Sequence, residues 1–268
     1  MLLTGNPASS IVLKKHLQAV NLEQSISEVG KNKQAVPMMF DTLDRLCRNL
    51  SYAISVQKDP ISKYLLARDK AYFTMICHSG GRGGDLELLF SSRLFEMSNS
   101  NGVLISQVLG KVVSINNPDN FILLPSKDSD ISPVSHLSCS IANDAQVDLK
   151  SGCLFRVQDK KTKTITNRPV TSTCMTDRLK MHLKAINLYE SETSHSSRRG
   201  CSITLKLLGV PADDICKHIG WNSNAMLDHY AVEGRILNSS GAVYALAQAA
   251  DQVSEQFMNL NNLKRFYL

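Results

Sequence analysis

Apolar residues recur at steps of three and four along the first strongly patterned segment of the chain. They form a stripe on one face of a helix with 3.6 residues per turn, and the members of the stripe are Phe40, Leu43, Cys47, Leu50 and Ile54. A second helix is predicted to begin at Pro60, because proline is well tolerated at the first helical position. It is predicted to run towards Cys77 and to end at Gly80.

The middle of the chain, residues 102–157, has a different pattern. Short β-rich runs at 103–105, 112–113 and 121–124 flank a turn signal at 116–120. This pattern predicts a small antiparallel sheet that includes Lys111.

Helical periodicity returns in the last third of the chain. Helices are predicted over 176–186, over 201–208 with Gly209 closing the helix, and from Pro211 onward. A long amphipathic stripe follows, made of Val243, Leu246, Ala250, Val253, Phe257 and Leu260. The predicted fold class is therefore α+β, mostly α-helical, with one small antiparallel sheet.

The composition is that of a globular protein with a sizeable core. Of 268 residues, 43% are hydrophobic and 20% are charged, which excludes a disordered tail and a small disulfide scaffold. No apolar run is long enough to cross a membrane, and no secretory signal is present at the start. Seven widely spaced cysteines without a C-x-x-C pair favour a reduced intracellular protein over disulfides or zinc.

The net charge of +6 is concentrated in one stretch. Residues 151–199 hold ten Lys or Arg against four acidic residues, so this stretch accounts for the whole excess. Such a stretch is typical of proteins that bind a polyanion, and nucleic acid is the first candidate for this partner. A solvated basic face without a partner is an equally common explanation when the charge is considered alone.

Several common catalytic patterns are missing. The sequence has no P-loop, no G-x-S-x-G elbow, no H-E-x-x-H motif and no EF-hand loop. A spaced set of polar and aromatic residues remains, each with an ordinary structural explanation when taken singly. The set consists of Arg82, Asp85, Lys111, His195, Arg198, Trp221 and Tyr230.

Taken together, over about residues 37–268, this set resembles the catalytic domain of the tyrosine recombinases. The motif of that family is Arg, a hairpin Lys, His-x-x-Arg, His or Trp, and Tyr, and every position is filled here in order. The intervals, with 29 residues from Arg82 to Lys111 and nine from Trp221 to Tyr230, are similar to those of Cre recombinase. Stretches such as 33–37 and 218–221 look most like eukaryotic Crypton- and DIRS-type transposon recombinases.

The resemblance implies a chemical role for each residue. Arg82 and Arg198 would clamp the non-bridging phosphate oxygens with permanently charged forks, and Tyr230 would attack phosphorus. His195 would act as the general acid or base, and the indole N–H of Trp221 would bind the phosphate.

Further roles follow from the same resemblance. Lys111 would protonate the leaving 5′ oxygen, with Lys127 as the fallback, and Asp85 would orient the arginine or the histidine. Arg199 follows Arg198 directly, so the motif arginine could be displaced by one; Arg199 is otherwise a candidate phosphate contact. Other candidate DNA contacts are Lys160, Lys161 and Lys163. No metal or other cofactor is expected.

The expected organisation has three parts. Residues 1–36 would be a linker or helical tail, too short for the separate DNA-clamping domain of full-length relatives. A trimmed chain is expected, and a derived protein that has lost this domain is the alternative. Residues 37–240 would be the catalytic domain, and 241–268 a helix that docks on its own or a neighbouring subunit.

The expected function is site-specific recombination or transposon integration on double-stranded DNA, through a 3′-phosphotyrosine. The chain would assemble as a dimer to tetramer on DNA, with a free monomer left open, and it would work in the nucleus. Two alternatives stay open: a DNA-binding protein without strand transfer, and a type IB topoisomerase-like enzyme.

Overall fold

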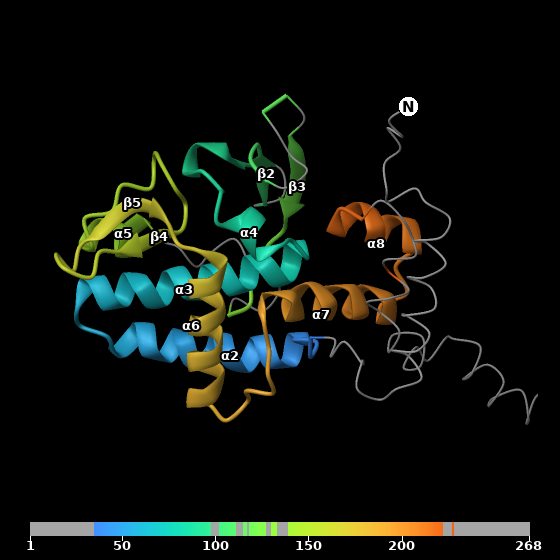
Figure 1. Cartoon of the computed structure of the whole chain (residues 1–268), viewed down its shortest axis with the longest axis horizontal. Helices are drawn as coiled ribbons and strands as arrows, with labels where there is room; N and C mark the ends of the chain where they lie inside the picture. The colour runs from blue at the N-terminus through green and yellow to red at the C-terminus, as the bar shows by residue number, and fades with distance from the viewer. Residues whose placement is uncertain are drawn as a thin grey trace, which may run out of the picture. The chain divides into compact units, whose positions relative to one another are not determined.

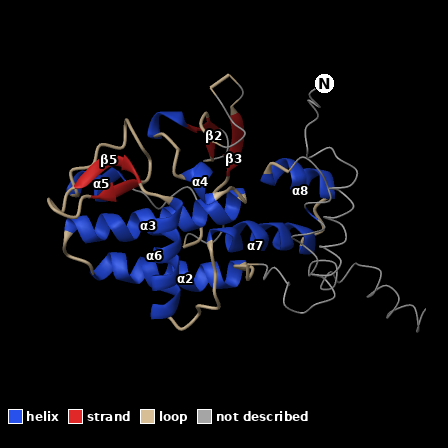
Figure 2. Ribbon diagram, viewed as in Figure 1, coloured by secondary structure: helices blue, strands red, loops and turns tan. Residues whose placement is uncertain are grey.

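The computed structural model describes residues 35–97, 102–110, 115–116, 118–126, 130–132, 139–221 and 227. Over these residues the fold is mostly α-helical with small antiparallel sheets (Figure 2), which confirms the predicted fold class. The predicted tail over 1–36 lies almost wholly outside the described residues, and the docking helix over 241–268 lies entirely outside them. Within the described part, no helix is long and apolar enough to span a membrane.

Two long helices form the frame of the domain (Figure 1). Helix α2 (Phe40–Val56) buries the predicted stripe, including Leu43, Cys47 and Leu50, against helix α3 (Pro60–Ser79). Both helices are confirmed, and so are the start at Pro60 and the stop at Gly80, which adopts φ +58°. That left-handed conformation suits glycine and ends the helix.

Helix α3 is the central element, because almost every side chain from residue 67 to residue 77 is buried. Its start is capped by the Asp59 carboxylate, which accepts a hydrogen bond of 2.8 Å from the Ser62 backbone N–H. It contacts α2, α5 (Cys139–Asp144), α6 (Ser172–Ala185) and α7 (Ser194–Leu207). The elements that carry the candidate site are therefore arranged around one helix.

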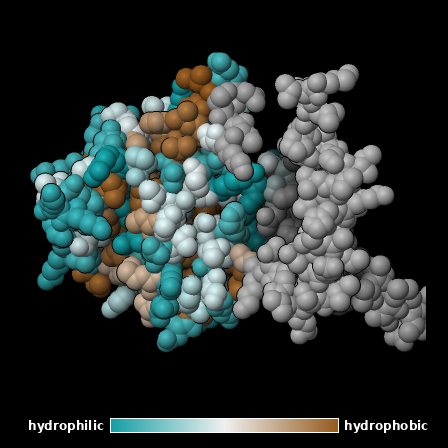
Figure 3. Space-filling model, viewed as in Figure 1, coloured by the Kyte–Doolittle hydropathy of each residue, from teal (hydrophilic) through white to brown (hydrophobic). Residues whose placement is uncertain are grey.

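A three-stranded antiparallel sheet lies against α3, in the order β1 (Leu94–Glu96), β2 (Val103–Gln107), β3 (Asp119–Leu123). Strands β2 and β3 confirm the runs predicted at 103–105 and 121–124, whereas Lys111 and the run predicted at 112–113 lie outside the described residues. Strand β1 carried no sequence signal. Leu94 pairs with Ile105, and Ile105 pairs with Phe121. Because neighbouring residues of a strand point to opposite faces, the alternate side chains Phe95 and Ile122 are exposed on the outer face. Figure 3 shows apolar side chains gathered at this end of the molecule.

A second antiparallel pair, β4 (Arg156–Gln158) and β5 (Ile165–Pro169), was not predicted. Ile165 packs with Tyr64 and with residues of α5. Tyr64 belongs to the first half of α3, so the β4–β5 hairpin lies near the start of that helix, as Figure 1 shows.

Helix α6 confirms the helix predicted over 176–186, and α8 (Ala212–Ile219) confirms the one predicted from Pro211. Helix α7 begins seven residues earlier than predicted, at Ser194. A capping box explains the difference: the Thr193 hydroxyl accepts from the His195 N–H at 3.3 Å, and the Ser196 hydroxyl accepts from the Thr193 N–H at 2.8 Å.

Candidate active site

Arg82 lies in a tight turn between α3 and the short helix α4 (Gly83–Leu86). A Cβ on Gly80 would lie 2.9 Å from Ile219 of α8, so this turn passes close to α8. The Arg82 side chain is 35% exposed, and its Nη1 lies 3.6 Å from Asp85 Oδ2. Arg82 can therefore meet a ligand from solvent while Asp85 restrains it.

The end of β2 is joined to the same turn. Gln107 Nε2 donates hydrogen bonds to the carbonyl oxygens of Leu109, at 3.0 Å, and of Asp85, at 3.4 Å. A Cβ on Gly110 would lie 2.9 Å from Asp85 Oδ1, so Gly110 touches the Asp85 carboxylate directly. The residue just before Lys111 is thereby placed against the Arg82 turn.

Arg198 connects three parts of the fold at one point. Its Nη1 donates a hydrogen bond of 2.7 Å to the Gly80 carbonyl oxygen, two residues before Arg82. Its guanidinium carbon lies 5.1 Å from the ring centroid of Trp221, a cation–π geometry. Only 4% of Arg198 is exposed, so packing fixes its position before any ligand arrives.

His195 is exposed at the start of α7, one turn before Arg198. Residues three apart on a helix are neighbours on its surface, so His195 and Arg198 share a face. A Cβ on Gly83 would lie 3.3 Å from Ser194 Cβ. The first turn of α7 is thus packed against the residue that follows Arg82.

Trp221 directly follows α8 and is 8% exposed. Gly220 ends α8 with φ +74°, and the Trp221 N–H donates a hydrogen bond of 2.8 Å to the Cys216 carbonyl oxygen. His218 Nε2 lies 2.7 Å from the His78 carbonyl oxygen, which holds α8 to the end of α3. Helix α8 is therefore held to α3 at the point where the Arg82 turn begins.

This arrangement is similar to that of solved recombinase structures. XerH site-specific recombinase bound to palindromic difH, in a post-cleavage complex, matches with a TM-score of 0.59 at 13% identity, over 80% of this chain and 54% of the XerH chain. A pre-cleavage XerH complex with difH gives 0.52 at 14% identity, over 82% of this chain and 62% of that chain. XerA recombinase matches with a TM-score of 0.50 at 16% identity, over 75% of this chain and 60% of the XerA chain.

The chain has the tyrosine recombinase catalytic fold. It spans between 54% and 62% of the length of these three structures. Comparison with family models and with curated proteins by sequence gives no match. The finer resemblance to Cre and to Crypton- and DIRS-type recombinases stays a prediction.

Within this fold, the structure brings together Arg82, Asp85, His195, Arg198 and Trp221. Lys111, its fallback Lys127 and Tyr230 lie outside the described residues. Leu227 is described: it is buried in the same apolar cluster as Trp221 and Ile215 of α8. Leu227, three residues before Tyr230 in the sequence, is therefore part of the α8 core.

Arg199 is placed differently from the phosphate contact considered above. It is only 6% exposed, and its Nη1 donates a hydrogen bond of 2.7 Å to the Ala35 carbonyl oxygen. The next residue, Gly200, passes so close to Met38 that a Cβ would overlap the Met38 carbonyl oxygen. In this structure Arg199 holds the entering segment to α7 rather than facing solvent.

The lysines proposed as DNA contacts lie together on the turn of the β4–β5 hairpin. Lys160, Lys161 and Lys163 are exposed. The Asp159 carboxylate accepts hydrogen bonds from the Thr162 and Lys161 backbone N–H groups, which lower its pKa and fix the turn. A 20-residue helix is about 30 Å long, so this turn and the Arg82 turn lie towards opposite ends of α3.

Sequence reasoning missed the buried ionic cluster that joins α3 to α6. Asp69 is fully buried; it pairs with Arg68 at 2.6 Å and lies 2.9 Å from His182 Nε2, and it also bonds Arg178. Burial raises the pKa of Asp69, but the hydrogen bond from His182 and the charges of Arg68 and Arg178 outweigh burial and lower it. The signal in the sequence was the charged triplet 68–70 between the apolar residues 65–67 and 71–73 of the same helix.

Glu87 was missed as well. Its Oε2 accepts a hydrogen bond of 2.6 Å from the Ser172 N–H, at the start of α6. The two contacts, through Asp69 and Glu87, hold α6 beside α4 and the Arg82 turn. Among the described residues, no group of three or more His, Cys, Asp or Glu side chains could hold a metal ion.

Proposed function

We propose that this chain cleaves and rejoins DNA strands as a site-specific recombinase or transposon integrase. One observation carries the proposal: Arg82, His195, Arg198 and Trp221, spread over 140 residues of sequence, belong to elements that meet at the end of α3. Packing for stability alone does not require a partly exposed arginine, an exposed histidine and a second guanidinium with a fixed position around one turn. A phosphodiester undergoing substitution requires this kind of set.

The proposed reaction is a transesterification at phosphorus. The Tyr230 phenolic oxygen attacks the scissile phosphorus, a phosphotyrosine bond forms to the 3′ side, and the bond to the 5′ oxygen breaks. His195 takes the phenolic proton, and Lys111 gives a proton to the leaving 5′ oxygen. The reverse attack by a 5′ hydroxyl rejoins the strand, so bond energy is conserved without ATP.

Arg82 and Arg198 have different roles in this proposal. Arg82 is partly exposed and reaches the phosphate from solvent, whereas Arg198 is fixed by the Gly80 carbonyl and the Trp221 ring. A guanidinium fixed in advance stabilises developing charge without reorganisation during the reaction. Trp221 supports Arg198 with its ring and offers its indole N–H to the phosphate.

The proposed partner is double-stranded DNA, bound by copies of the chain that associate on it. The basic β4–β5 turn would contact duplex away from the scissile phosphate, because it lies towards the other end of α3. The helix expected over 241–268 would dock on a neighbouring subunit, and the nucleus is the proposed place of action.

The test is the covalent intermediate. The chain is incubated with a pool of labelled nicked duplexes that carry randomised sequence, so that a cleaved strand loses the fragment needed for rejoining. We expect an SDS-resistant adduct in which mass spectrometry of the digest places the nucleotide on Tyr230. Tyr230→Phe should abolish the adduct, and Tyr244→Phe, a matched change in the same part of the chain, should retain it.

The alternatives predict other results. Duplex binding without any adduct in the wild-type chain would identify a DNA-binding protein without strand transfer. Relaxation of supercoiled plasmid without preference for any sequence would identify a type IB topoisomerase-like enzyme. An adduct on a different tyrosine would reject Tyr230 as the nucleophile.

A further inference from the structure

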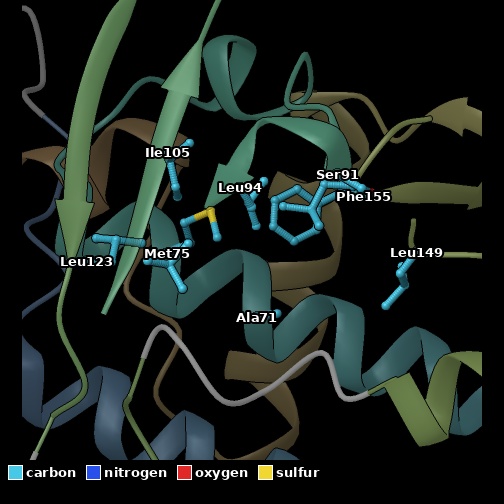
Figure 4. A pocket seen from close by; sticks show the side chains of 10 residues that line it. Ala71, Met75, Ser91, Leu94, Ile105, Leu123, Leu149 and Phe155 are labelled. Carbon is cyan, nitrogen blue, oxygen red and sulfur yellow. The ribbon is translucent and has the colours of Figure 1, made fainter. Parts of the chain in front are cut away.

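A cavity of about 210 Å³ lies between α3 and the inner face of the three-stranded sheet. Figure 4 shows Ala71 and Met75 on α3 facing the sheet residues Leu94, Ile105 and Leu123 across it. None of the candidate site residues that the structure describes, Arg82, Asp85, His195, Arg198 and Trp221, lines this cavity. It is a separate feature of the fold.

The side chains that line the cavity are apolar apart from Ser91, and Figure 4 shows Leu149 and Phe155 on the side opposite Leu123. The cavity is partly open to solvent, so a ligand can enter it, and its walls lack the van der Waals partners that a close-packed interior supplies. Cavities of about 150 Å³ with similar linings stay dry and bind benzene. The present cavity exceeds that volume, so a fused bicyclic molecule is the better match.

One polar side chain, that of Ser91, is among the residues that line the cavity. Ser91 Oγ is buried, and among the described residues no hydrogen-bond partner lies within reach of it. The Ser91 backbone is fixed by a 2.9 Å hydrogen bond from its N–H to the Gly152 carbonyl oxygen, so the hydroxyl stays at the cavity wall. A buried hydroxyl without a partner is costly, and a ligand that supplies one would recover that cost.

We propose that this cavity binds a planar, mostly apolar molecule of about the size of indole, with a single hydrogen-bonding group that meets Ser91 Oγ. Apolar walls with one placed polar group are the usual make-up of small-molecule sites. The walls supply affinity through burial of the rings, and the hydroxyl selects the orientation. The proposal does not depend on DNA cleavage.

The first experiment titrates the full chain with indole and follows binding by calorimetry and by the melting temperature. We expect saturable binding, and at least a tenfold loss of affinity in Ala71→Met, whose side chain fills the cavity. Ala185→Met adds the same side chain at an exposed position of α6 and should bind indole like the wild type. Equal indole affinity in Ala71→Met and the wild type, or no indole binding to the wild type, would overturn the proposal.

The second experiment separates the hydroxyl from the apolar walls and requires no repacking. Ser91→Ala should weaken indole binding by about fivefold, because a hydrogen bond is lost. Benzene, which has no group to meet the hydroxyl, should bind Ser91→Ala as tightly as the wild type or more tightly. A parallel loss of both probes, or no change for indole, would reject the proposed polar contact even if Ala71→Met does not fold.

Discussion

Arg198 and Gly80 are 118 residues apart in sequence, and Arg198 Nη1 donates a hydrogen bond of 2.7 Å to the Gly80 carbonyl oxygen. This contact joins the middle of the candidate site to the turn that presents Arg82. It also satisfies one backbone carbonyl at the end of α3, where the last carbonyl groups have no hydrogen-bond donor within the helix. His218 contacts a second carbonyl, that of His78, so both α7 and α8 are held to the same helix end.

The two arginines should therefore respond differently to mutation. Arg82→Ala should fold normally, because the side chain is partly exposed, and should lower cleavage by about 10²–10³-fold. Arg198→Ala should lower both cleavage and the free energy of unfolding, because a buried charged hydrogen bond and the Trp221 contact are lost together. Cleavage rates and urea unfolding measure the two effects. Full activity in Arg82→Ala, or unchanged unfolding in Arg198→Ala, would contradict this division.

Arg199→Ala should act on stability rather than on DNA binding. The side chain is buried and bonded to the Ala35 carbonyl, so its removal should cost about 1.5–3 kcal/mol in the free energy of unfolding. Arg168→Ala removes an exposed arginine and should change stability little. Unchanged unfolding of Arg199→Ala, together with a slope of log DNA affinity against log salt that is reduced by about 0.9, would contradict this interpretation.

The β4–β5 turn should contribute to DNA affinity through charge. Replacing Lys160, Lys161 and Lys163 by Gln should reduce the slope of log affinity against log salt by about 0.9 for each lysine that meets a phosphate. Cleavage within an already bound complex should be unaffected, because the turn lies towards the far end of α3 from Arg82. The control replaces Lys180 and Lys184 of α6 by Gln. An equal reduction of the salt slope in this control would mean that the β4–β5 turn has no special role in DNA binding.

The Asp69 cluster should make stability depend on acid pH. The pKa of Asp69 is lower in the folded chain than in the unfolded chain, where it is about 3.9. Its contribution is therefore complete above about pH 3.9 and is lost as pH falls through the folded value. Asp69→Asn should lower the free energy of unfolding at pH 7 by about 3–5 kcal/mol and flatten this acid dependence.

Asp44→Asn is the matched control for that measurement. Asp44 pairs with Arg48 on the exposed side of α2, so the change should cost no more than about 1 kcal/mol. Urea unfolding of both variants across acid pH makes the comparison. A similar loss in the two variants would mean that the buried cluster adds nothing beyond a surface pair.

Much of the helical frame could be predicted from local pattern. The stripe of α2, the proline that opens α3 and the glycine that ends it are signals carried by neighbouring residues, and local hydrogen bonding makes them reliable. The strand β1 and the β4–β5 pair could not be predicted, because β1 and β4 are three residues long and show no periodicity. Their stability comes from partners distant in sequence, such as Ile105 for Leu94.

The start of α7 was missed for a related reason. Ser196, Ser197 and Arg198 are buried polar residues, so the first half of the helix shows no apolar stripe. Their burial is possible because the adjacent Thr193 cap and two residues distant in sequence, Gly80 and Met38, supply hydrogen-bond partners. Only the folded arrangement brings Gly80 and Met38 to the helix.

The sequence by itself determined which residue types are available for phosphate chemistry and in what order they come. It contains two adjacent arginines, Arg198 and Arg199. The assignment of Arg198 as the motif arginine depended on the residue spacing of the family that the chain resembles. The tertiary structure gave each a different environment, because successive residues of an α-helix point about 100° apart. Arg198 faces Gly80 and Trp221, while Arg199 faces Ala35. Helix geometry and long-range packing decided which arginine lies at the candidate site.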